Sequence, residues 1–293
     1  GRSRERVRAG DWRRASRPGS GRSARRNGKG IFMKHGSIAR LSQDVRGSGF
    51  DGQIAVDYLN SLAGEQDDGI QKRLLKELIR QYVVLEKRVD ALLKNTLPAM
   101  VADEIKYSGR FETRSCDCTI LFSDIVGFTH LAEKVSPELL IELLDRLFRG
   151  MDEMVERFGG TKIKTIGDAY MAVFGAPLPC EEHAIKAVRT GMSFSSLVDG
   201  FNREHDQSIQ VRIGIHTGRV MAGVVGRDRM QFDIFGDTVN IASRFESSGE
   251  KGRVNVSHET YLRARERFDF EERGEIALKN KANMKAYFVV GER

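Results

Sequence analysis

Between residues 119 and 290 the chain alternates short apolar runs with longer amphipathic segments. The short runs have the length of strands, and the amphipathic segments have the apolar spacing of helices. Ser136 and Pro137 are typical of a helix N-cap and first helical position. Glycine marks two expected turns, at Gly167-Asp168 and Thr217-Gly218. We expect strands at 119–123, 209–216, 220–225, 254–257 and 285–290, a hairpin at 162–174, and helices at 137–158, 181–201 and 237–248.

The order of these elements is strand, helix, strand, strand, helix, strand, with further elements after them. It predicts an α+β fold with a ferredoxin-like βαββαβ core and a C-terminal elaboration. With 293 residues and 40% hydrophobic residues, the chain can bury a core of ordinary size. No apolar run approaches the ~20 residues that cross a bilayer, so we expect a soluble, cytoplasmic chain, either whole or one piece of a longer receptor.

Two aspartates, Asp124 and Asp168, each follow a strand-like apolar run and stand at a glycine-marked turn. This placement exposes their carboxylates. Hard divalent cations prefer oxygen ligands, and two carboxylates brought together can hold a pair of ions for in-line attack on a phosphorus. The alternative is that each Asp only stabilises its turn. The first hypothesis is therefore phosphoryl-transfer chemistry.

Two further segments, 211–226 and 231–244, follow these aspartates in the sequence. Together with the segments around Asp124 and Asp168 they resemble the class III nucleotidyl cyclases, and the resemblance covers roughly residues 92–290. It implies that Asp124, Asp168 and the backbone carbonyl of Ile125 bind two Mg²⁺ or Mn²⁺ ions. One ion would activate the ribose 3′-hydroxyl, and the other would neutralise the β- and γ-phosphates.

The resemblance also implies which base is read. Lys164 and Asp233 stand where adenylyl cyclases carry a Lys and an Asp or Thr, whereas guanylyl cyclases carry Glu and Cys there. A carboxylate can accept from the adenine N6 amino group, and an ammonium can donate to a ring nitrogen. Guanine presents the opposite pattern, so each mismatched buried group would cost about 1–3 kcal/mol. The alternative for this pair is an ordinary surface ion pair.

The remaining site residues also come from the resemblance. It implies that Asn240 orients the ribose, that Arg244 stabilises charge at the α-phosphate, and that Arg212 and Lys279 hold the triphosphate. Asn240 and Arg244 are four apart on an expected helix and so share a face. Around Lys279 the usual glycines are replaced, and Lys281 is an alternative contact. We expect His216 to be structural.

A predicted helix at 70–97 precedes the catalytic segments. Its apolar residues recur at spacings of three and four, as in the seam of a two-stranded coiled coil: Leu75, Leu78, Tyr82, Leu85, Val89 and Leu92. The alternative is a helix docked on its own domain. A short helical transducer stands here in the resembled family, whose active sites are shared across a dimer. The chain carries both sets of site residues, so we expect a homodimer with two equivalent sites and an inactive monomer.

Charge is concentrated at the N-terminus. Residues 1–34 carry twelve Lys or Arg against Glu5 and Asp11, a net charge of +10 in a chain whose total is +7. This tail has too few apolar residues to offset the entropy of ordering, so we expect it to be disordered. Binding of nucleic acid or membrane by this tail is the less favoured interpretation. The alternatives are that the tail is a solvated linker, or that it lies upstream of the native protein, which would then start at Met33. Residues 35–69 are unassigned and partly ordered.

Three cysteines, Cys116, Cys118 and Cys180, have no metal-ligand spacing and suggest a reducing compartment. We expect Cys116 and Cys118 to be buried on one strand face. The sequence therefore predicts a class III adenylyl cyclase catalytic domain at 98–293 that converts ATP to cyclic AMP and pyrophosphate. The rivals are a guanylyl or relaxed-specificity cyclase, a silent cyclase-like module, and a nucleic-acid or membrane binder. The upstream regulator is not indicated by the sequence.

Overall fold

The computed structural model describes residues 70–293, except 206, 228 and 278–281. The expected basic tail at 1–34 and the unassigned segment at 35–69 lie outside the described residues. So does Lys279, together with its alternative Lys281.

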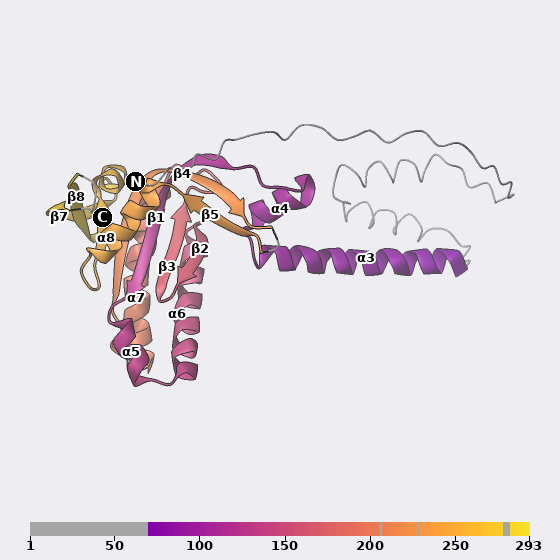
Figure 1. Ribbon diagram of the computed structural model, residues 1–293, viewed down its shortest axis with the longest axis horizontal. Helices are drawn as coiled ribbons and strands as arrows, with labels where there is room; N and C mark the ends of the chain where they lie inside the picture. Colours follow the sequence, from indigo (N-terminus) through magenta and orange to yellow (C-terminus); the bar gives the residue numbers. More distant parts are fainter. Residues whose placement is uncertain (1–69, 206, 228, 278–281) are drawn as a thin grey trace, which may run out of the picture. The chain divides into compact units, whose positions relative to one another are not determined.

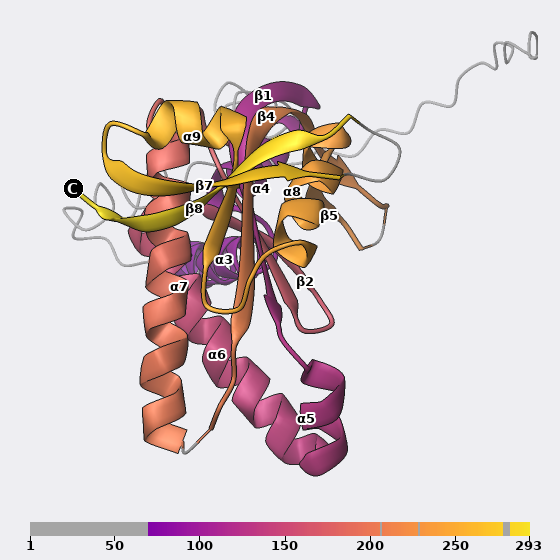
Figure 2. The same cartoon turned by 90° about the vertical axis from the view of Figure 1, so that its left-hand side faces the viewer.

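The described strands form one eight-stranded mixed sheet (Figures 1 and 2). Its path runs β2-β3-β1-β4-β6-β8-β7, and β5 pairs with β4 beside that path. This arrangement confirms the α+β fold with a ferredoxin-like core and a C-terminal elaboration. The strands are β1 (Arg114–Ile125), β2 (Thr161–Ile166), β3 (Ala169–Phe174), β4 (Val211–Val225), β5 (Gln231–Phe235), β6 (Val254–Ser257), β7 (Phe268–Ile276) and β8 (Met284–Glu292).

Helices α6, α7 and α8 match the helices predicted at 137–158, 181–201 and 237–248 to within a few residues, and the Ser136 side chain caps α6 as expected. Helices α4, α5 and α9 and strands β5 and β7 were not predicted. The described helices are α3 (Ile70–Lys94), α4 (Ala99–Ser108), α5 (Phe128–Lys134), α6 (Pro137–Arg157), α7 (His183–His205), α8 (Asp237–Ser247) and α9 (His258–Ala264).

Both faces of the central strands are buried, which explains why the strands read as continuous apolar runs. On one face Leu121 and Tyr170 belong to a cluster that includes residues of α6 and α7. On the other face Ile120 and Met171 belong to a second cluster with Leu97 and residues of α4, β5 and α8. Figure 2 shows α6 and α7 running along one side of the sheet.

The turn predicted at Thr217-Gly218 is wrong, because β4 continues through it without interruption. Thr217 pairs with Thr119 and Gly218 pairs with Cys118 in the antiparallel ladder with β1. A Cβ on Gly218 would lie 2.9 Å from Oγ1 of Thr238 in α8. This glycine therefore provides space for a helix against the strand instead of reversing the chain.

Helix α3 occupies most of the predicted transducer segment, and it ends at Lys94, before Leu97-Pro98. Its heptad leucines at 78, 85 and 92 are each about 60% exposed, so the described part of the chain does not cover this seam. Charged side chains join the helix to α4, with Lys106 on Glu86 and Lys94 2.9 Å from Asp103. Its pairing with a second chain stays a prediction.

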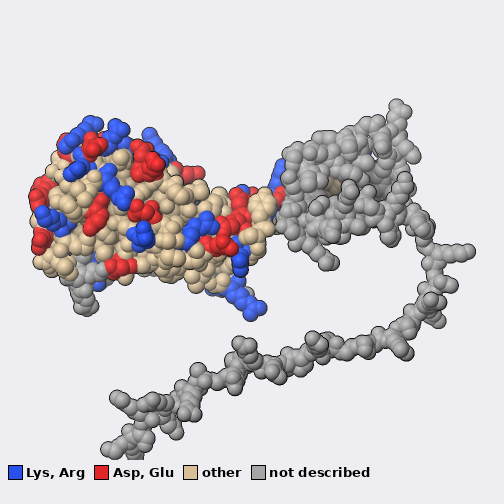
Figure 3. Space-filling model, turned by 90° about the horizontal axis from the view of Figure 1, so that it is seen from above, with Lys and Arg blue, Asp and Glu red and all other residues tan. Residues whose placement is uncertain are grey.

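The surface of the described part carries acidic and basic side chains intermingled on the face seen in Figure 3. Within residues 70–293, gaps excepted, we found no helix of the length and apolarity needed to cross a bilayer.

Candidate functional site

Asp124 and Asp168 lie close together although they come from different parts of the sheet. Asp124 lies near the end of β1, and Asp168 lies in the turn between β2 and β3, after Gly167 with its φ of 63°. Burial and the neighbouring charge of Asp124 raise the pKa of Asp168, while a backbone hydrogen bond with Ile125 acts in the opposite sense. Because a neighbouring carboxylate disfavours the ionised form of Asp168, a cation bound beside Asp168 would stabilise that form.

The donor set of this pair fits Mg²⁺ or Mn²⁺. In the residues described here, no cluster of three or more His, Cys, Asp or Glu side chains is arranged to hold a metal. A cage made only of side chains is not needed, since Mg²⁺ is commonly bound by one or two carboxylates together with water and substrate phosphates. Asp124 and Asp168 supply this pattern, and the backbone of Ile125 runs beside Asp168.

Arg212 lies between two carboxylates. It is the cross-strand partner of Asp124 in the β1–β4 ladder, and its Nη2 donates to Oδ2 of Asp124 at 2.7 Å. On its other side, Nε lies 3.2 Å from Oε1 of Glu246 in α8. Arg212 was predicted to hold the triphosphate; in the structure its guanidinium is bound to Asp124.

Glu246 was not predicted, yet it is buried beside this cluster. Burial and the charge of Asp124 raise its pKa to about 7, against the lowering effect of Arg212. Glu246 belongs to the buried face of α8, together with Thr238, Ile241, Ala242 and Phe245. A carboxylate at a core position of an amphipathic helix was the sequence signal that could have identified it.

Lys164 and Asp233 form an ion pair between β2 and β5, although 69 positions separate them. Nζ of Lys164 lies 2.5 Å from Oδ2 of Asp233, while Oδ1 accepts from the Ile234 backbone N–H at 2.9 Å. The side chain of Asp233 is only 13% exposed. The pair therefore has one buried member held by the backbone, which differs from a freely solvated surface pair.

Asn240 and Arg244 lie on α8 one turn apart, as predicted. Arg244 is about 200° around the helix from Glu246, because each residue turns the helix by ~100°. Glu246 faces Arg212, Asp124 and Asp168 of its own chain. Asn240 and Arg244 consequently belong to a different face of α8 from the one that meets Asp124.

A family model described as the adenylate and guanylate cyclase catalytic domain matches residues 112–291. This match covers more than half of the chain. The chain belongs to the class III adenylate and guanylate cyclase family. Cyclases of this class generally use divalent metal ions, which agrees with the paired aspartates.

The relatives of this cyclase domain include both specificities. An adenylate cyclase of Mycobacterium tuberculosis is 36% identical over 224 residues, which are 75% of this chain and 51% of that protein. The solved adenylyl cyclase CyaB from P. aeruginosa is 34% identical, with a TM-score of 0.60 over 62% of this chain and 98% of that one. A guanylate cyclase domain from Catenaria anguillulae, solved with GTP, is 33% identical, with a TM-score of 0.60 over 61% and 100%. The chain spans about half the length of the first of these relatives.

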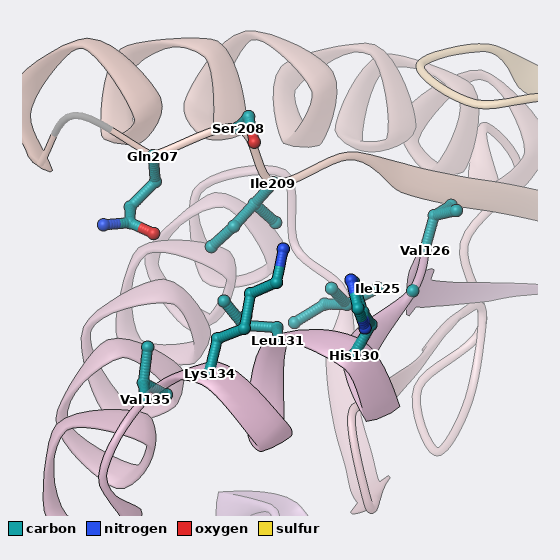
Figure 4. A pocket seen from close by; sticks show the side chains of 10 residues that line it. Ile125, Val126, His130, Leu131, Lys134, Val135, Gln207, Ser208 and Ile209 are labelled. Carbon is teal, nitrogen blue, oxygen red and sulfur yellow. The ribbon is translucent and has the colours of Figure 1, made fainter.

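A cavity of about 350 Å³ lies beside the metal-site loop of the cyclase domain. Figure 4 shows His130 and Lys134 projecting from α5 on one side of it, with Ser208 and Ile209 from the segment before β4 on the other. Ile125 reaches this cavity, but Lys164, Asp233 and Asn240 do not line it. The cavity is therefore separate from the predicted base and ribose contacts.

His216 and the cysteines have structural surroundings. His216 is buried, stacks on Phe245, and its Nδ1 lies 2.8 Å from Oγ of Ser257. All three cysteines are free thiols, with Cys118 buried and Cys116 half-buried. Burial raises the pKa of Cys118 to about 12, so this thiol is unreactive at neutral pH.

Proposed function

We propose that this cyclase is an adenylyl cyclase, converting ATP to 3′,5′-cyclic AMP and pyrophosphate. The observation that supports this choice is the Lys164–Asp233 pair, a donor and an acceptor held together at the predicted base positions. The carboxylate of Asp233 would accept from the adenine N6 amino group, and Lys164 would donate to a ring nitrogen. Both groups would be mismatched against guanine, at a cost of about 1–3 kcal/mol each.

The proposed reaction assigns one task to each remaining residue. Asp124, Asp168 and the Ile125 carbonyl would hold two Mg²⁺ or Mn²⁺, which supply an activated 3′-hydroxyl and charge neutralisation at the phosphates. Asn240 would orient the ribose. Arg244 would stabilise negative charge at the α-phosphate, a role that suits a planar, permanently charged guanidinium. Arg212 and Lys279 would hold the triphosphate.

A homodimer with two shared sites is part of the proposal. Asn240 and Arg244 lie on a different face of α8 from Glu246, which meets Asp124 through Arg212. A second chain would supply the missing half of each site. Exposed apolar side chains are available for such a contact, including Ile166 beside the metal turn and the cross-strand pair Met221 and Phe235. The exposed seam of α3 would extend the interface as a coiled coil.

The test uses the purified chain with ATP or GTP and with Mg²⁺ or Mn²⁺, and the products are resolved by chromatography. We expect cyclic AMP from ATP, little cyclic GMP from GTP, and no product when the cation is chelated. Equal use of both nucleotides would replace the proposal with a relaxed-specificity cyclase. Absence of any product from a dimeric, cation-loaded chain would favour a silent nucleotide-binding module.

The location and regulation of the protein also belong to the proposal, because the chain matches only about half the length of its relative from Mycobacterium tuberculosis. We propose a cytoplasmic location and regulation by an upstream domain or protein acting through α3. Binding of nucleic acid or membrane by the basic tail is not part of the proposal. A strongly salt-dependent affinity that disappears on deleting residues 1–34 would contradict this exclusion.

A further inference from the structure

The pair formed by Arg212 and Glu246 is incomplete. Nε of Arg212 and Oε1 of Glu246 are 3.2 Å apart, and both atoms are fully buried. Neither atom completes a hydrogen bond, so the two groups are close but poorly aligned. At its other end the guanidinium is bound to Asp124 by a well-formed hydrogen bond of 2.7 Å. The geometry thus favours the bond with Asp124 over the one with Glu246.

The backbone holds Glu246 in this place. A Cβ on Gly214 in β4 would lie 1.9 Å from the backbone nitrogen of Glu246, so strand and helix touch main chain to main chain. Arg212 is two residues before Gly214 on the same strand and therefore points to the same side of the sheet. With α8 fixed against β4, only side-chain rotation can change the distance between Arg212 and Glu246.

Under the proposed function Asp124 has two binding partners, because it accepts a hydrogen bond from Arg212 and is also a metal ligand. A cation bound to Asp124 weakens the hold of this carboxylate on the guanidinium. Glu246 is then the carboxylate left to Arg212, and rotation towards it satisfies both unpaired atoms. We propose that Glu246 is a positioning residue that draws Arg212 away from Asp124 during cation loading and holds it for the triphosphate. This inference rests on the proposed function.

Two other roles for Glu246 make different claims. As a third metal ligand it would belong to a cluster of acidic side chains around one point, and the structure places no such cluster among the described residues. As a bare negative charge it would attract cations but repel the triphosphate. Removing that charge would then tighten nucleotide binding, whereas removing a positioning residue weakens it. The sign of the change in nucleotide affinity separates these roles.

The experiment compares the full chain with its Glu246→Gln variant at about pH 8, where the carboxyl is ionised. Mn²⁺ affinity is measured without nucleotide by electron paramagnetic resonance. Binding of 3′-deoxy-ATP, which cannot cyclise, is measured by calorimetry at saturating Mn²⁺. We expect the variant to lose about threefold to tenfold in each affinity, as for one hydrogen bond of typical net strength. Glu156→Gln, at an exposed position on α6, is the matched control and should change neither.

Tighter binding of 3′-deoxy-ATP by Glu246→Gln would overturn the positioning role and leave a simple charge effect. Unchanged affinities for both Mn²⁺ and the analogue would overturn it as well, while leaving the proposed cyclase function intact. If the wild-type chain binds neither Mn²⁺ nor the analogue, the proposed function fails and the inference fails with it.

Discussion

Replacing Glu246 by Gln should stabilise the metal-free protein at alkaline pH, although it removes a buried ion-pair partner. Burial and Asp124 raise the pKa of Glu246 from 4.5 to about 7 in the folded state, with Arg212 opposing the shift and Asp168 adding to it. The folded state therefore binds this proton more tightly than the unfolded state does. Stability is lost as pH rises from about 4.5 to about 7, and the full loss is present above that range.

The size of the effect follows from the shift. Each pKa unit corresponds to 1.36 kcal/mol, so the shift from 4.5 to about 7 is worth of the order of 3 kcal/mol. Little screening by solvent is expected, because Glu246 is only 7% exposed. Glutamine imitates the protonated acid and cannot ionise. The variant should therefore gain up to about 3 kcal/mol over wild type at about pH 8.5 and almost nothing at about pH 4.5.

The assay is urea unfolding followed by circular dichroism at several pH values, with chelator present to remove divalent cations. The informative quantity is the difference in unfolding free energy between variant and wild type, followed as a function of pH. Any constant difference between a neutral acid and an amide does not depend on pH and therefore drops out. Glu156→Gln should give a flat difference. A flat difference for Glu246→Gln as well would refute the reasoning, because it would mean that the carboxyl of Glu246 has an ordinary pKa.

Three further predictions concern the proposed reaction. Asp168→Asn should leave folding and dimerisation intact but lower cyclic AMP formation by orders of magnitude, because the amide loses the charge that binds the cation; near-normal turnover would contradict the metal site. Lys164→Glu with Asp233→Cys should lower ATP use and raise relative GTP use, and an unaltered ATP preference in competition assays would place base reading elsewhere. Mixing Asp124→Ala with Arg244→Ala, each inactive alone, should recover up to about a quarter of wild-type turnover, since random pairing gives half mixed dimers with one intact site of two. Mixed dimers without any activity would refute the shared site.

The central strands were predictable because they read as continuous apolar runs, and the long helices were predictable because their apolar residues recur at helical spacing. Strand β1 is apolar on both faces, and α6 begins at a serine cap followed by proline. The unpredicted elements lack such signals. Strand β7 reads Phe268–Ile276 with three glutamates and an aspartate, and most of its residues are not buried. Helix α5 is seven residues long and contains no fully buried residue.

The candidate site residues were proposed from the resemblance, and the sequence alone could not show which of them contact one another. Lys164 and Asp233 are far apart along the chain, and their contact depends on β5 folding back along β4. The error at Gly218 has a related cause. A glycine can mark a turn or a close approach of another element, and local sequence does not distinguish these two uses. Here the approaching element is α8, which also carries Glu246.

The charge balance of the cluster connects stability to the proposed function. Arg212 contacts Asp124 and Glu246, and Asp168 lies beside Asp124; of these three carboxyl groups, Asp168 and Glu246 have raised pKa values. Ionising Asp168 and Glu246 therefore costs folding free energy, part of which a bound cation would recover. Any cation that binds only the folded state stabilises it in proportion to the logarithm of its concentration over its dissociation constant. Under the proposed function, a divalent cation bound at Asp124 and Asp168 would offset part of this negative charge.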